Sequence, residues 1–290
     1  MIEMKRFVLL ALSLGLLALA PALAEGLTVE GATLPAPEEL LPEGSEASMP
    51  EAVETIAPDD GETVPSVVLK LVEEKLPLTG VKIGIDPGHQ AHGNNEKETV
   101  APGSNEKKAK VTSGTSGAAT GIAEYVTNLE ISLKLRDALV SQGAEVYMTR
   151  ETHDVDISNQ ERAKLMNGYG VDLVLRIHCD GAENKSKHGI ALYCSRSNAI
   201  AEESYRAAEA ILPVLCEATG AQNNGIVSND NYTGQNWSEV PCLMVECGFL
   251  SNADEDRLLN DEDYQWKLAT GLTNGIIAYI QQRDGVQVNE

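Results

Sequence analysis

The sequence is poor in positive charge. Its 290 residues contain 22 Lys and Arg against 44 Asp and Glu, which gives a formal net charge of -22. Because the phosphates of a nucleic acid are neutralised by Lys and Arg, this imbalance argues against a nucleic-acid partner. Hydrophobic residues still make up 42% of the chain, a share typical of globular proteins that excludes wholesale disorder.

Cysteine is also scarce, with five residues and no C-x-x-C pair, which excludes a disulfide scaffold. Four of the five lie on expected strands and are predicted to be buried free thiols: Cys179, Cys194, Cys242 and Cys247. Neighbours in a strand point to opposite faces, so Cys179 and Cys247 should face the core rather than act beside His178 and Glu246 as nucleophiles. The sequence also has no G-x-S-x-G motif, and nothing in it arranges a Ser-His-Asp triad.

Long apolar runs are missing except near the N-terminus, at residues 7–20. Lys5 and Arg6 precede this run, and Ala22-Leu23-Ala24 follows it. A run of this length is short for a membrane span of about 20 residues. The layout predicts a secretory signal peptide over residues 1–24 and therefore an exported protein, with an uncleaved membrane anchor as the alternative.

The next segment, residues 25–69, has eleven acidic residues, six prolines and neither Lys nor Arg. Like charge, Pro and the lack of apolar periodicity predict a disordered acidic linker. A helix at about 67–76 is expected to lead into a folded domain over residues 70–290, with its core at 81–283.

Within this domain, apolar strands alternate with helical patterns. Strands are expected at 81–85, 144–149, 171–177, 189–194 and 241–245, and helices at 123–142, 157–167, 199–218, 253–260 and 261–282. Residues 90–121 and 223–240 are expected to be loops. Alternation of this kind predicts an α/β domain whose sheet is covered on both faces.

Three ionisable residues, His89, His178 and Glu246, stand at the carboxyl ends of expected strands. Ligands of open α/β sheets bind at that edge. Two imidazoles and one carboxylate also form a known catalytic zinc set. Spacing alone leaves the third ligand open among Glu124, Glu130, Glu246 and His92.

Six motifs follow one another along the domain. They are I-D-P-G-H at 85–89, E-x3-N-L at 124–129, T-R at 149–150, E-R-A at 161–163, R-I-H at 176–178 and E-C-G-F-L-S-N at 246–252. In this order they resemble the zinc-dependent N-acetylmuramoyl-L-alanine amidase family of the amidase 3 type, over roughly residues 81–283. The resemblance implies a single three-layer α/β domain, with a mixed, mostly parallel sheet flanked by helices.

The resemblance also implies a site and a reaction. His89, Glu124 and His178 match the ligands of one Zn²⁺ per chain, and Glu246 matches the carboxylate that assists catalysis. The bond cleaved joins the lactyl group of N-acetylmuramic acid to L-Ala in peptidoglycan. Two alternatives stay open: a cell-wall-binding protein that keeps the fold, and a zinc peptidase that acts on another amide.

Five side chains are expected to contact the substrate: Arg150, Arg162, Asn252, Lys107 and Lys108. Both lysines belong to a basic cluster in the 90–121 loop, and they would meet stem-peptide carboxylates unless the loop is merely solvated. Trp237 and Tyr232 are expected either to stack on a sugar or to pack at the rim. We expect a monomer, targeted to the wall by the domain itself, by the linker, or by a partner or activator protein.

Some positions depart from the family pattern: Gln90, Tyr125, Arg176 and Cys179-Asp180-Gly181. None of them removes a metal ligand, so the differences concern the rim of the site. Arg176 stands where Ser is usual, and it is expected to face the side of the sheet opposite His178.

Overall fold

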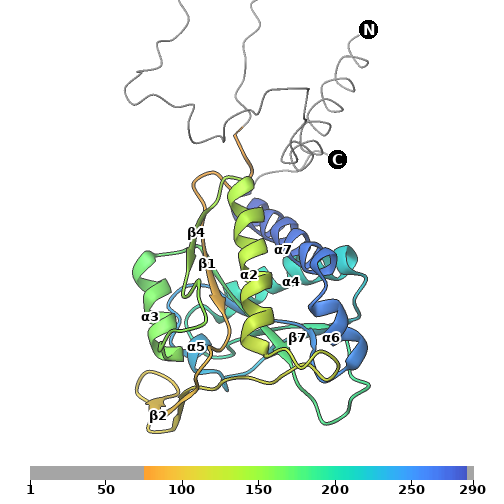
Figure 1. Cartoon of the computed structure of the whole chain (residues 1–290). Coiled ribbons are helices and arrows are strands. Elements are labelled where there is room, and N and C mark those ends of the chain that lie inside the picture. Colours follow the sequence, from red (N-terminus) through yellow and green to blue (C-terminus); the bar gives the residue numbers. More distant parts are fainter. Residues whose placement is uncertain (1–74, 286–290) are drawn as a thin grey trace, which may run out of the picture. The chain divides into compact units, whose positions relative to one another are not determined.

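The computed structural model describes residues 75–285 (Figure 1). The predicted signal peptide, the acidic linker and most of the expected helix at 67–76 lie outside these residues and stay predictions. Between residues 75 and 285, no helix combines the length and the apolar character needed to cross a membrane.

A six-stranded sheet organises the domain, with strand order β4-β1-β5-β8-β6-β7. Its strands are β1 (Lys82–Pro87), β4 (Glu145–Met148), β5 (Leu173–Asp180), β6 (Ile190–Cys194), β7 (Asn223–Ser228) and β8 (Cys242–Phe249). The first four in this order run parallel, β6 pairs antiparallel with β8, and β7 runs parallel to β6. The expected mixed, mostly parallel sheet is confirmed.

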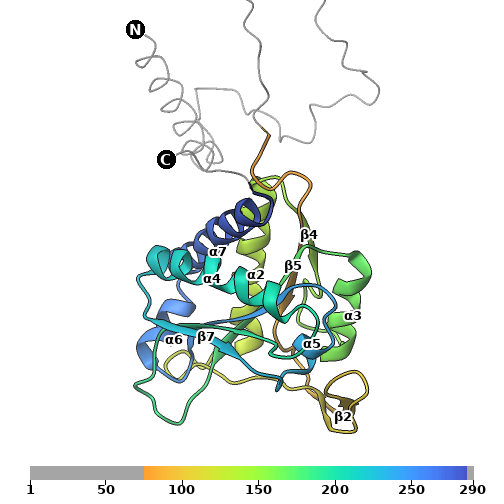
Figure 2. The same cartoon turned by 180° about the vertical axis from the view of Figure 1, so that it is seen from behind.

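Three long helices form a layer on one face of this sheet. The helices of the domain are α2 (Glu124–Ser141), α3 (Asn159–Tyr169), α4 (Ala201–Thr219), α5 (Thr233–Asn236), α6 (Ala253–Leu259) and α7 (Glu262–Arg283). Figure 1 shows α2 beside α7, and Figure 2 shows α4 against α7 from behind. Alternate strand residues such as Ile83, Leu175 and Val245 point toward these helices and are fully buried, because successive side chains of a strand point to opposite faces of the sheet.

The opposite face of the sheet has a smaller cover. Met166 of α3 packs there against Val174 of β5 and Cys242 of β8. Ser158 and Glu161 form a reciprocal capping box that begins α3 at this place. On this face α3 therefore covers a second, smaller apolar cluster.

Two segments that we expected to be loops contain regular structure. Residues 90–121 include an antiparallel hairpin of β2 (Asn94–Thr99) and β3 (Lys107–Val111), and 223–240 includes β7 and α5. The hairpin is mostly polar, and its one buried apolar side chain, Val111, belongs to neither apolar cluster of the domain, so the sequence lacks the sustained alternation that indicates a strand. Edge strand β7, with the sequence N-N-G-I-V-S, has only two apolar residues, too few to show an alternation, although Ile226 packs against the core.

Side chains of the α5 region hold this hairpin. Trp237 Nε1 donates a hydrogen bond to the Thr99 carbonyl (2.9 Å), and Asn236 Nδ2 donates one to the Val100 carbonyl (3.1 Å). Of the two roles considered for Trp237, the structure therefore shows packing at the rim.

Candidate metal centre

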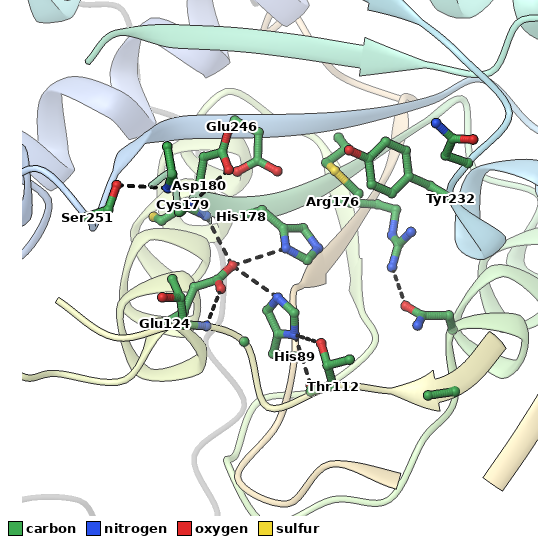
Figure 3. Close-up of a pocket in the computed structure, with 18 of the residues that line it drawn as sticks. His89, Thr112, Glu124, Arg176, His178, Cys179, Asp180, Tyr232, Glu246 and Ser251 are labelled. Atoms are coloured by element: carbon green, nitrogen blue, oxygen red, sulfur yellow. Dashed lines mark hydrogen bonds and ion pairs between the residues drawn. The ribbon is translucent and has the colours of Figure 1, made fainter. Parts of the chain in front are cut away.

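Two adjacent strands and one helix bring the predicted ligands together. His89 follows β1, His178 lies near the end of β5, and Glu124 begins α2 at the same edge of the sheet. Glu124 Oε1 lies 3.1 Å from His89 Nε2 and 3.2 Å from His178 Nδ1 (Figure 3). Among residues 75–285, these three form the one group placed to hold a metal ion, with ligand atoms within 4.8 Å of one another. Glu124 is thus the third member of the group.

The geometry of this group fits a tetrahedral metal. Ligand atoms about 2.1 Å from a zinc ion lie roughly 3.4 Å from one another, close to the separations found here. His89 Nδ1 lies 2.9 Å from the Thr112 carbonyl oxygen, which only accepts hydrogen bonds. Nδ1 therefore donates this hydrogen bond, and Nε2 is the ring nitrogen that faces the Glu124 carboxylate. Nε2 and the carboxylate oxygen are thus placed to bind one cation together.

Two glycines make room for the ligands. A Cβ at Gly88 would lie 2.4 Å from the His178 ring, and one at Gly114 would lie 2.6 Å from Glu124 Oε2. His89 itself has a φ of 60°, a left-handed conformation that non-glycine residues seldom adopt. The D-P-G-H turn is therefore shaped to present the His89 ring to the other two ligands.

Buried arginines fix the backbone of this turn. Arg150 Nη2 donates to the Gly88 carbonyl (2.9 Å), and Arg162 Nη1 donates to the Pro87 carbonyl (2.8 Å) and to Asp86 Oδ1 (2.8 Å). Both guanidinium groups are almost fully buried. They hold the segment that carries His89 from behind, and neither lies in the lining of the pocket.

The protonation states of His178 and Glu124 also suit metal binding. Burial lowers the pKa of His178 to about 4, so its ring is neutral at pH 7. Burial alone would raise the pKa of Glu124, but hydrogen bonds with His178 and His89 outweigh it and hold that pKa well below its usual range. Asn128 Nδ2 and the Thr115 backbone N–H also donate to this carboxylate. A neutral imidazole and a carboxylate are the forms that bind metals.

Glu246 lies directly beside the group, paired in register with His178 on the neighbouring strand. It is buried, and its Oε2 has no hydrogen-bond partner among the described residues. Burial raises the pKa of Glu246 well above its usual range, and the nearby carboxylates of Glu124 and Asp180 raise it further. A carboxylate in these surroundings is a strong proton acceptor.

A pocket of about 720 Å³ opens over the group. The hairpin and the segment after β7 form one wall, which includes Lys108 and Tyr232. The other wall is the segment after β5, from Asp180 to Lys185. This volume is in the range of sites that take a ligand of several chemical groups.

Of the five residues expected to contact the substrate, the structure places one in the pocket lining. Lys108 lines the pocket, and its Nζ donates to the Asn231 carbonyl (2.7 Å). Lys107 is exposed and Asn252 caps α6, so that both, like the two arginines, lie outside the lining. Substrate contact therefore stays a prediction for Lys108, and the placement gives the other four no surface on this pocket.

One expectation about the lining was wrong. Arg176 lines the pocket together with His178, because residues two apart in a strand share a face. The same alternation confirms the cysteine prediction: all five thiols are free, and Cys179 and Cys247 lie in the core on the other face. The sequence signal for Arg176 was present, since it replaces the usual Ser two positions before a ligand.

Comparison with known proteins shows the family of this chain. The profile of the N-acetylmuramoyl-L-alanine amidase family Amidase_3 matches residues 83–278. The chain belongs to this family. Its sequence is 28% identical to the N-acetylmuramoyl-L-alanine amidase LytC of Bacillus subtilis, over 74% of this chain but only 39% of that relative. It is also 28% identical to the germination-specific N-acetylmuramoyl-L-alanine amidase of Bacillus subtilis, over 72% of this chain and 83% of the other.

Solved structures agree as well. The crystal structure of the N-acetylmuramyl-L-alanine amidase Ami1 from Mycobacterium abscessus is 27% identical, with a TM-score of 0.65. The similarity covers 70% of this chain and 100% of that one. The region that matches is the domain that carries the candidate metal centre.

Proposed function

We propose that this amidase-family chain is a zinc enzyme that hydrolyses the amide bond between the lactyl group of N-acetylmuramic acid and L-Ala in peptidoglycan. The single observation that carries the proposal is the convergence of His89, Glu124 and His178 beside a buried carboxylate in an open pocket. A protein that only binds the cell wall would need neither that carboxylate nor the ligand set.

The residues of the site have distinct tasks in such a reaction. His89, Glu124 and His178 would hold one Zn²⁺, which polarises the amide carbonyl and makes water more acidic when it is bound. Glu246 accepts the proton of the attacking water and returns it to the departing amine. Its raised pKa suits both halves of this transfer, because a weakly acidic carboxyl holds the proton long enough to deliver it.

The cellular setting is part of the same proposal. Peptidoglycan lies outside the cytoplasmic membrane, so we propose that the apolar segment at residues 7–20 directs export. The acidic segment at 25–69 would then set the distance between the exit site and the catalytic domain. A protein activator and a monomeric state remain predictions.

The products of digestion test the proposal. The full chain, loaded with zinc, is incubated with intact peptidoglycan, and the soluble products are analysed by mass spectrometry. We expect free stem peptides that begin with L-Ala, and none from the Glu246→Ala variant. Cleavage elsewhere in the peptide would support a peptidase instead, and binding to the wall without release would contradict the enzymatic role.

A further inference from the structure

Arg176 places a buried positive charge in the pocket. Its side chain is 5% exposed, yet it belongs to the lining. Nε donates to Asp86 Oδ2 (2.8 Å), and Nη2 donates to Asn159 Oδ1 (2.7 Å). The third nitrogen, Nη1, has no hydrogen-bond partner within residues 75–285. It lies so close to the backbone of Gly234 that a Cβ there would be 2.2 Å away.

The charge of this cluster is not balanced by its own residues. One carboxylate, Asp86, forms ion pairs with two guanidinium groups, those of Arg162 and Arg176 (both 2.8 Å). Glu98 acts on Arg176 only at longer range, and its carboxylate accepts the Gln160 backbone N–H. A buried cation that is not fully neutralised by carboxylates destabilises a fold. An excess of positive charge beside an open pocket therefore points to an anionic ligand.

The two walls of the pocket also differ in charge. The hairpin side of the pocket has two cations, Lys108 and Arg176. The segment on the other side has two carboxylates and one cation: Asp180, Glu183 and Lys185. Figure 3 shows Arg176 and Asp180 on opposite sides of His178. A substrate that crosses the centre therefore meets a wall of net positive charge on one side and a wall of net negative charge on the other. In a muramoyl peptide the carboxylates belong to the peptide, which should accordingly extend toward Lys108 and Arg176.

The spacing selects one carboxylate of that peptide. Arg176 precedes the ligand His178 by two residues, which is about 6.6 Å along a strand. Successive Cα atoms of a peptide are about 3.8 Å apart, so a carboxylate on the residue after L-Ala lies roughly 4–7 Å from the scissile amide, a range that includes this strand distance.

We propose that the guanidinium of Arg176, oriented by Asp86 and Asn159, binds the carboxylate on the stem-peptide residue that follows L-Ala. This inference rests on the proposed amidase function. It makes Arg176 a determinant of specificity: a stem peptide whose second residue carries a carboxamide in place of the carboxylate would lose a charge-assisted hydrogen bond.

Two matched substrates test the inference. They are soluble muramoyl peptides that differ only in a carboxylate or a carboxamide on the residue after L-Ala. For the wild-type full chain with zinc, we expect kcat/KM to favour the carboxylate about tenfold or more. Arg176→Gln should bring that ratio close to one, Arg176→Lys should keep part of it, and Lys107→Ala, outside the lining, should leave it unchanged.

The ratio separates recognition from a purely structural role. A structural defect in Arg176→Gln would lower both rates together and leave the preference intact, which would overturn the inference. Equal rates of the wild-type protein on both substrates would overturn it without any variant, even if the Gln substitution prevents folding. Cleavage of neither substrate by the wild type would instead contradict the proposed function and the inference with it.

Discussion

The two faces of strands β5 and β8 contrast sharply although they belong to the same residues in alternation. On one face, Leu175, Ile177 and Cys247 are buried in an apolar core beneath α2, α4 and α7. On the other face, Arg176, His178 and Glu246 line the pocket. The difference shows how a sheet can separate stability from chemistry, since each face can change while the other is kept.

The largest expected difference concerns neighbours on β8, Glu246 and Cys247. Glu246→Gln should lower kcat/KM by roughly 10²–10⁴-fold, because a positioned general base contributes about that much. Its thermal stability should not fall, since the substitution removes a buried, unpaired carboxylate. Cys247→Ala should do the reverse, with a loss of roughly 1–3 kcal/mol in stability and little change in kcat/KM. Kinetics and denaturant unfolding of both variants check this, and a Glu246→Gln protein that stays fully active would break the comparison.

Ion pairs near the pocket also stabilise the fold, and a substitution of Asp86 tests this contribution. Burial would raise the pKa of Asp86, but Arg162 and Arg176 outweigh it and lower that pKa below its usual range. A carboxyl with a depressed folded-state pKa stabilises the protein above its unfolded pKa of about 3.9, and this contribution is lost as the pH falls further.

Asp86→Asn should therefore cost about 3–5 kcal/mol at pH 7, because it leaves two buried guanidinium groups short of a carboxylate. The difference from wild type should shrink as the pH drops from 4 toward 2. Urea unfolding over this pH range measures it. A difference that does not depend on pH would mean that Asp86 acts through packing rather than through charge.

Much of this arrangement could be predicted from the sequence. Apolar runs predicted five of the six strands of the sheet, and the polar residues at the carboxyl ends of three of them indicated the edge where His89, His178 and Glu246 meet. Choosing Glu124 as the third ligand needed the family resemblance, since helix position alone favours a solvated residue at that place. The hairpin at 94–111 could not be predicted, because polar side chains that fold over a pocket carry no apolar period.

The prediction for Arg176 was wrong for a different reason. Its alternation with His178 was sufficient to place it in the pocket, so the physical signal was available and was misjudged. The groups that contact the ligands were harder to predict, because the Thr112 carbonyl and the Thr115 backbone N–H are groups that any residue type would provide. The Thr112 hydroxyl, 3.1 Å from His89 Nδ1, does depend on the residue type.

The smallest expected effect compares two neighbours in the hairpin. Lys108→Ala should raise KM for muramoyl peptides about two- to fivefold, in line with an exposed charge worth no more than about 1 kcal/mol. Lys107→Ala should leave KM unchanged, because Lys107 does not line the pocket. Steady-state kinetics at low and high salt check both, and equal effects of the two substitutions would place the lysines on one diffuse basic surface.

Zinc stoichiometry tests the central claim most directly. Native mass spectrometry of the full chain, after zinc addition and removal of the excess, should show one ion per molecule. Glu124→Gln should lose it, while Asp180→Asn, a carboxylate of the lining outside the ligand group, should keep it. A wild-type chain without zinc, or a Glu124→Gln chain that retains it, would contradict the metal centre assigned here.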